Sequence, residues 1–135
     1  MIETKIDVRY PDCDQMGIVH HAVYPIWYEM GRMDFFARCG CDYTKSRSFG
    51  VDPAMVHLEL DYGLPVRYPQ TVTLRTSCTL LEGKKIAFRY EIWGEGEKPL
   101  ASAKSFHIWV KDGKSINIET DVPEMFRAYQ GAVEA

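Results

Sequence analysis

Apolar and polar residues alternate along the second half of the chain, which is the pattern of antiparallel strands with one buried face. The alternation is cleanest over residues 70–81, where Val72 and Leu74 stand between Thr71, Thr73 and Arg75. Gly-containing polar segments separate these runs and predict turns. We therefore expect strands at 2–10, 54–62, 70–81, 86–92, 100–110 and 115–118.

A different period, close to that of an α-helix, covers residues 21–38. Apolar residues recur there every three or four positions and predict one buried stripe: Val23, Ile26, Trp27, Met30, Met33 and Ala37. Pro25 fits only the first turn, where its missing N–H costs nothing, and Gly40 suits the stop. Shorter helical segments are expected at 42–50 and 122–129.

The order of elements is one strand, a long helix and then an antiparallel meander. A sheet with one apolar face must cover that face, and one long helix is available to do so. We predict an α+β fold in which a curled antiparallel sheet of about five strands wraps around the helix in a single domain, 1–135. Trp93 and Trp109 are expected on the outer face, which predicts oligomerisation.

Composition excludes several classes of function. Apolar residues are 46% and charged residues 26% of the chain, and the formal charge of −3 gives no basic face for nucleic acid. No signal-peptide stretch or membrane-length apolar run is present, so we expect a cytoplasmic protein. The cysteine spacing matches neither a zinc site nor a disulfide framework, and His57 with Glu59 lacks a third ligand, so no metal is expected.

Residues 12–26 hold the candidate chemistry. Two carboxylates, Asp12 and Asp14, a glycine and two histidines lie in a polar loop between the first strand and the long helix. Such groups at a helix N-terminus are suited to general acid–base or nucleophilic catalysis at a carbonyl. The same residues are also common caps and turn formers, so the loop alone leaves both interpretations open.

The wider pattern resembles the hotdog-fold thioesterases, in the branch of 4-hydroxybenzoyl-CoA thioesterase and the YbgC-like proteins. The resemblance rests on the spacing of Tyr10, Asp12, Asp14, Gly17, Val19, His21, Tyr24, Trp27, Glu29 and Arg32, and on the order of elements over nearly the whole chain. It implies an enzyme that acts on acyl-CoA thioesters without a metal or cofactor, since coenzyme A is part of the substrate. It also implies dimers or tetramers with sites between subunits.

The resemblance matches Asp14 to the catalytic aspartate and His21 to the residue that begins the helix. Asp14 would attack the thioester or activate a water, and the backbone N–H groups of His21 and Ala22 would hold charge on the carbonyl oxygen. The His21 side chain could assist, and His20 is a weaker candidate on the same grounds. Gly17 would allow close backbone approach, or simply form a turn. Asp12 is expected to order the loop.

Substrate contacts are expected from Tyr24, beside this loop, and from Lys84 and Lys85 in a later turn. In the hydroxybenzoyl enzyme that turn carries basic residues that contact the nucleotide, and two lysines suit phosphates as mobile charges. A solvated hairpin turn explains the lysines equally well. Glu29 and Arg32, three residues apart on the helix, could pair and are interpreted as structural.

The preferred function is hydrolysis of an acyl-CoA to a free acid and coenzyme A. An acyl-carrier-protein thioesterase would need a basic docking surface, of which the composition gives no strong sign. A hotdog dehydratase places its histidine and carboxylate in a different local motif. A non-catalytic acyl-CoA-binding module would not need Asp14. The acyl group itself is not specified by the sequence.

Overall fold

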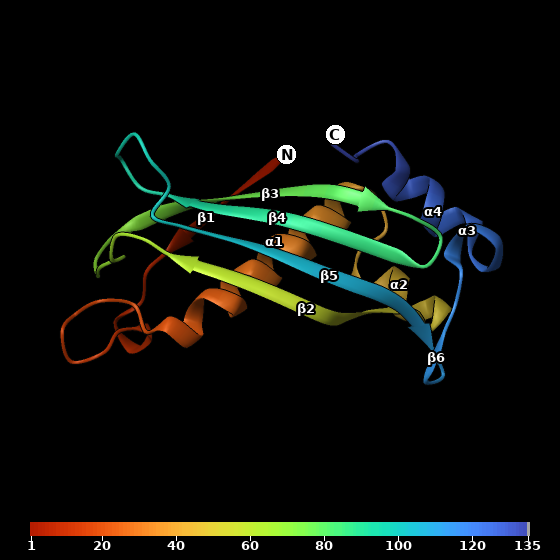
Figure 1. Cartoon of the computed structure of the whole chain (residues 1–135), viewed down its shortest axis with the longest axis horizontal. Coiled ribbons are helices and arrows are strands. Elements are labelled where there is room, and N and C mark those ends of the chain that lie inside the picture. The colour runs from red at the N-terminus through yellow and green to blue at the C-terminus, as the bar shows by residue number, and fades with distance from the viewer. Residues whose placement is uncertain (135) are drawn as a thin grey trace.

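The computed structural model describes residues 1–134 and has one curved antiparallel sheet with a long helix along one face (Figure 1). The main strands follow the order β1-β3-β4-β5-β2, and the short β6 pairs with β5. The strands are β1 Ile2–Asp7, β2 Asp52–Tyr62, β3 Thr71–Leu81, β4 Lys85–Trp93, β5 Ala101–Lys111 and β6 Lys114–Ser115. The helical segments are η1 Tyr10–Asp12, η2 His21–Val23, α1 Tyr24–Arg38, α2 Tyr43–Phe49, α3 Ile118–Asp121 and α4 Pro123–Gln130.

This architecture confirms the predicted hotdog fold, with five main strands and α1 as the central helix. β3, β4 and β5 form a meander, while β1 and β2, from the first half of the chain, are added at its two edges. The N-terminal end of α1 lies at the end of the sheet where β2 finishes (Figure 1).

The long helix ends at Arg38, as predicted, but it begins at Tyr24 after the 3-10 turn η2, and it buries a different face. Pro25 occupies the first turn, and Gly40 adopts a φ of +83° just after the helix. The predicted stripe was wrong in part: Trp27 is buried, but Ile26 is 58% and Met30 44% exposed. The buried face is mostly aromatic and comprises Tyr24, Trp27, Tyr28, Gly31, Arg32, Phe35 and Phe36. Aromatic side chains bury more apolar surface than Ile or Met, which favours this face toward the sheet.

Gly31 lets α1 approach the sheet closely. A Cβ atom at this position would lie 2.8 Å from Leu74 Cδ2 and would overlap Thr76 Oγ1 on β3. Phe35 packs edge-on against Phe88 of β4 at 5.2 Å between ring centroids. The core thus forms between the aromatic face of the helix and the inner face of the sheet.

The expectation for Trp109 was also wrong. Trp109 is fully buried on the helix side of the sheet, near Phe36, and its ring stacks on Tyr129 of α4 at 5.9 Å. α4 covers this end of the sheet, which the strand pattern alone could not reveal. Trp93 is partly exposed, and Arg75 lies over its ring at 4.5 Å.

Three element boundaries differ from prediction. β1 ends at Asp7 instead of Tyr10, and Tyr10 begins the 3-10 turn η1, in which Pro11 suits the first turn. The predicted strand 115–118 is only the two-residue β6, and Ile118 starts α3 instead. A bulge between Met55 and His57 breaks the alternation of β2, so its predicted apolar face is largely exposed.

Candidate active site

Residues 12–20 form a tight hairpin that holds the candidate catalytic loop. Asp14 N–H donates to the Ile18 carbonyl at 2.9 Å, and His20 N–H donates to the Asp12 carbonyl at 2.9 Å. Val19 N–H donates to the carbonyl of Val66, in the segment between β2 and β3. Backbone hydrogen bonds on both sides therefore fix the loop to the body of the protein.

Asp14 begins the turn at the tip of this hairpin. Its carbonyl accepts from Gly17 N–H at 3.0 Å, and its Oδ1 accepts from Met16 N–H at 2.8 Å. This is an Asx-type turn, so Asp14 does act as a turn former. The same bond fixes the carboxylate in orientation, and no partner for Oδ2 is found among residues 1–134. The half-buried side chain can therefore order the loop and still present one oxygen to a ligand.

Gly17 has a φ of +76°, a conformation that side chains other than glycine rarely adopt. Nothing lies within 4 Å of a Cβ built at this position, so the backbone conformation, and not crowding inside the subunit, requires the glycine. The turn role of Gly17 is thus explained by the fold. Close approach to a thioester stays a prediction.

Asp12 orders the loop, as expected. Arg9 Nη2 donates to its Oδ1 at 2.9 Å and Arg9 Nε to its Oδ2 at 3.2 Å. Hydrogen bonding to Arg9 holds the pKa of Asp12 below its usual range. Both carboxylate oxygens of Asp12 accept hydrogen bonds from Arg9, so Asp12 is structural. Asp14, two residues later, uses only its Oδ1 among the described residues.

The histidines lie where the hairpin meets the helix. His20 is the N-cap of η2, and its Nδ1 accepts from the N–H of Ala22 at 3.1 Å. The rings of His20 and His21 stack at 4.2 Å between centroids. The N–H of Ala22 is therefore occupied, whereas no acceptor for the N–H of His21 is found among the described residues. The capping role of His20 was not foreseen, although a polar residue just before a helix is a recognised cap signal.

Tyr62 is a residue of this site that the sequence reasoning missed. Its hydroxyl, at the end of β2, donates to the carbonyl oxygen of His21 at 2.8 Å. Tyr24 lies behind it, 4% exposed, with its ring edge-on to that of Tyr62 at 4.9 Å. Burial raises the pKa of Tyr24. Tyr24 supports the start of the helix from the core, and within one subunit it has little surface to offer a substrate.

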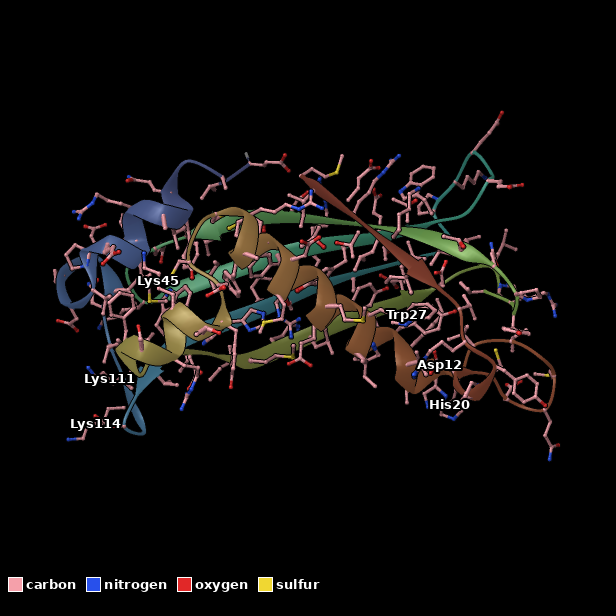
Figure 2. All side chains as sticks on the ribbon, turned by 180° about the vertical axis from the view of Figure 1, so that it is seen from behind. Asp12, His20, Trp27, Lys45, Lys111 and Lys114 are labelled. Atoms are coloured by element: carbon pink, nitrogen blue, oxygen red, sulfur yellow. The ribbon has the colours of Figure 1, made fainter. Side chains whose placement is uncertain are left out.

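Lys84 and Lys85 lie far from this loop. The backbone of Lys85 is opposite Ile108 on β5, whereas Tyr62 is opposite Ala101 on the same strand. The intervening seven residues of strand span about 23 Å. Figure 2 shows the same separation, with Asp12 and His20 at one end and Lys111 and Lys114 at the other. The loop and the two lysines are therefore not brought together within one subunit.

Glu29 and Arg32 do not pair. Glu29 is exposed, and the buried Arg32 donates from Nη1 to the hydroxyl of Tyr90 on β4 at 3.0 Å. Within residues 1–134, no three His, Cys, Asp or Glu side chains are grouped as metal ligands would be. In the same part of the chain, no helix is long and apolar enough to span a bilayer.

An antiparallel hotdog sheet, a central helix and a carboxylate loop at the helix N-terminus together define a thioesterase-type protein. The sequence matches the model of the thioesterase superfamily over residues 16–101. The chain belongs to this superfamily and is a thioester hydrolase. The match includes Gly17, α1, α2 and the strands β2, β3 and β4.

Individual relatives agree with this assignment. The chain is 32% identical to "Putative acyl-CoA thioesterase YneP" of Bacillus subtilis (strain 168), over 95% of this chain and 94% of the relative. The crystal structure of a hypothetical protein, TT1821 of Thermus thermophilus, superposes with a TM-score of 0.89 at 33% identity, covering 96% of this chain and 98% of that one. A DHNA-CoA thioesterase of Staphylococcus aureus gives 0.89 at 25% identity, covering 96% and 88%.

Proposed function

We propose that the protein hydrolyses acyl-CoA thioesters to a free carboxylic acid and coenzyme A. The observation that carries the proposal is the placement of Asp14 at the tip of a hydrogen-bonded hairpin that leads directly into His21, the first residue of η2. Asp14 keeps one carboxylate oxygen for which residues 1–134 supply no partner, and His21 offers the first backbone N–H of a helical segment. The name of the B. subtilis relative supports coenzyme A as the thiol carrier.

Asp14 supplies the attacking oxygen or activates a water in this proposal. A direct attack would form a mixed anhydride with release of the thiolate, and water would then hydrolyse the anhydride. As a general base, the carboxylate would take a proton from the attacking water. The hydrogen bond from Met16 supports both routes, because it fixes the carboxylate without using its second oxygen.

The N–H of His21 polarises the thioester carbonyl. It is the first N–H of η2, which runs directly into α1, so the partial positive charge of the helix N-terminus adds to it. Ala22, the other predicted donor, gives its N–H to His20 in this structure. Ala22 could serve only if His20 moved away, so His21 is the donor we propose.

Coenzyme A would extend toward a second copy of the chain, because Lys84 and Lys85 lie too far from Asp14 in their own subunit. We propose a homo-oligomer, a dimer or a tetramer, in which β2 is the contact edge. β2 is an edge strand that exposes Met55, Val56 and Tyr62, and such edges pair readily. Light scattering on the purified protein tests this assembly.

Release of coenzyme A from a panel of short, long and aromatic acyl-CoAs tests the activity. Asp14→Asn is the sharpest variant, because an amide oxygen can still accept from Met16 and keep the turn. We expect a loss of about 100-fold or more in kcat, the scale of a lost general base. Asp12→Asn is the matched control, a carboxylate two residues away whose loss should weaken the loop but leave the chemistry.

Two results would redirect the assignment. Equal and negligible rates for wild type and Asp14→Asn across the panel would contradict acyl-CoA hydrolysis, and acyl-carrier-protein substrates would then be assayed. Tight acyl-CoA binding with the same slow rate in both proteins would point to a non-catalytic binding module. We place the reaction in the cytoplasm, where cell fractionation can test it.

A further inference from the structure

Arg32, in the middle of α1, is the only Lys or Arg side chain that is buried within residues 1–134, at 9% exposure. No Asp or Glu carboxylate of these residues lies within ion-pair distance of it. Buried charges in proteins are almost always paired, because an isolated ion loses its hydration. The proposed thioester chemistry at Asp14 and His21 does not use this cation.

The one hydrogen-bond partner of the Arg32 side chain among these residues starts a buried polar chain. Tyr90 hydroxyl lies 2.6 Å from Ser105 Oγ, and Ser105 Oγ lies 2.8 Å from His107 Nε2. Arginine can only donate, so Tyr90 donates to Ser105 and Ser105 donates to His107 Nε2. The proton of the neutral imidazole is then on Nδ1, a buried atom that has no partner among the described residues. Every group in this chain is then neutral, and none compensates the charge of Arg32.

The other guanidinium nitrogens of Arg32 have no hydrogen-bond partner among the described residues. They are not fully buried either, because they are not among the described atoms that are both buried and unpartnered. Arg32 lines a cavity of about 180 Å³ between α1, α2, α4 and the sheet. Phe36, Trp109 and Tyr129 form much of its wall and contact one another through their rings. The cavity therefore combines an aromatic wall with one uncompensated fork of N–H donors.

Two acidic residues also line this cavity. Asp52 is already held by Arg47 at 2.6 Å, and Glu29 is exposed and one turn away from Arg32 on α1. Neither neutralises the guanidinium. We propose that this cavity binds a small organic carboxylate, with its two oxygens on the N–H fork of Arg32 and its carbon skeleton against the aromatic wall.

The geometry favours a carboxylate over other anions. A guanidinium fork matches the two oxygens of a carboxylate, and such bidentate pairs are strong when shielded from water. An apolar cavity with a few polar groups is the usual form of a small-molecule site. A phosphate has more oxygens to satisfy than the fork of one guanidinium can serve.

The carboxylate could come from two sources. One is the far end of an acyl group that carries a terminal carboxylate, which rests on the proposed acyl-CoA hydrolysis. Arg32 lies eleven residues after His21, or about 16 Å along the helix. An acyl group that reaches it would therefore be long, or its thioester would be bound at the catalytic loop of a neighbouring subunit. The other is a free organic acid that binds independently of turnover.

Titration of the whole protein with benzoate and with benzamide tests the site directly. The two compounds share one shape and differ in charge, and calorimetry reports binding without any thioester. We expect saturable binding of benzoate about tenfold or more tighter than benzamide. Arg32→Gln should lose that advantage, whereas Glu29→Gln, a control on the same helix and cavity, should keep it.

Several results would overturn the proposal. These are no saturation with benzoate at millimolar concentration, equal affinity for benzamide, equal displacement of benzoate by inorganic phosphate, or a crystal structure with a carboxylate from a second copy on Arg32. If Arg32→Gln fails to fold, the comparison of benzoate with benzamide on the wild-type protein still decides.

Release of coenzyme A from sebacyl-CoA and decanoyl-CoA then assigns the source. Faster turnover of the carboxylated chain, lost in Arg32→Gln while decanoyl-CoA turnover is unchanged, assigns the site to the substrate. Equal turnover of both, with benzoate binding intact, assigns it to a free acid. Failure to hydrolyse any thioester contradicts the proposed function. The carboxylate site is then judged from the benzoate titration alone.

Discussion

The hydroxyl of Tyr62, at the end of the edge strand β2, donates a 2.8 Å hydrogen bond to the carbonyl oxygen of His21. This bond joins the far edge of the sheet to the first residue of the helical segment that bears the candidate oxyanion donor. This carbonyl belongs to η2, which leads directly into α1. The sheet therefore helps to set the orientation of the helix start.

We predict that Tyr62→Phe lowers kcat for acyl-CoA hydrolysis while KM changes little, because only the positioning of His21 is relaxed. Its cost in unfolding free energy should be about 1 kcal/mol or less, the net value of one partly exposed hydrogen bond. Steady-state kinetics and urea unfolding measure the two effects. Tyr68→Phe is the control, since no hydrogen bond of that hydroxyl is found among residues 1–134. Equal kinetics for both variants and wild type would remove Tyr62 from the site.

The capping role of His20 can be distinguished from a catalytic role by two substitutions. His20→Ala removes the acceptor of the Ala22 N–H and should cost about 1 kcal/mol of stability, as other N-cap losses do. His20→Asn should restore most of that stability because Asn is a good N-cap. If activity follows stability in both variants, His20 is structural. Loss of activity in a fully stable His20→Asn would show that the imidazole itself takes part.

Close packing at Gly31 should make it intolerant of any side chain. Gly31→Ala forces a methyl group into Leu74 and Thr76, and we expect a loss of about 1–3 kcal/mol, the range for overpacked cores. Gly131→Ala is the control, because nothing lies within 4 Å of a Cβ built there and its φ is −73°. Thermal unfolding of both variants measures the difference. A Gly31→Ala protein as stable as Gly131→Ala would mean that the helix can move off the sheet without cost.

His107 should make the folded state sensitive to mild acid. Burial first, and then the charge of Arg32, lowers its pKa from 6.5 to about 4. The unfolded chain therefore binds a proton at a higher pH than the folded one. Stability is fully present above pH 6.5 and falls as the pH drops from 6.5 toward 4, by about 3 kcal/mol in total.

Urea unfolding at pH 7 and pH 5 tests this pH dependence in wild type and in His107→Gln. The variant retains a hydrogen-bonding side chain for Ser105 but has no proton to gain. We expect the wild type to lose more stability between the two pH values than the variant does. The carboxylates titrate in both proteins, so their contribution cancels in the difference. Parallel losses would show that His107 titrates alike in the folded and unfolded chains.

The periodic part of the fold could be predicted from the sequence because its cause is local. Alternation sets which strand residues face a core, and Pro25 and Gly40 limit α1 through their own backbone constraints. The loop around Asp14 was also readable, since a strand, a glycine turn and a helix start each leave a local signal. These features yielded the α+β class and the candidate site.

The choice of helix face was decided only by the tertiary structure. α1 carries two apolar stripes, and the sheet takes the aromatic one with Phe35 and Gly31 because those side chains fit it. Trp109 is buried by α4, an element far away in the chain. Whether a residue faces outward depends on what covers it, which no local pattern encodes.

The sequence by itself determined most of the elements, their order and the candidate residues of the loop. Only the tertiary structure decided the partners: Tyr62 for His21, His20 for the Ala22 N–H, and Tyr90 for Arg32. It also separated Lys84 and Lys85 from Asp14, because strand pairing fixes opposite ends of the sheet. Each of these depends on long-range geometry, since hydrogen bonds and buried charges are set by which surfaces meet when the chain folds.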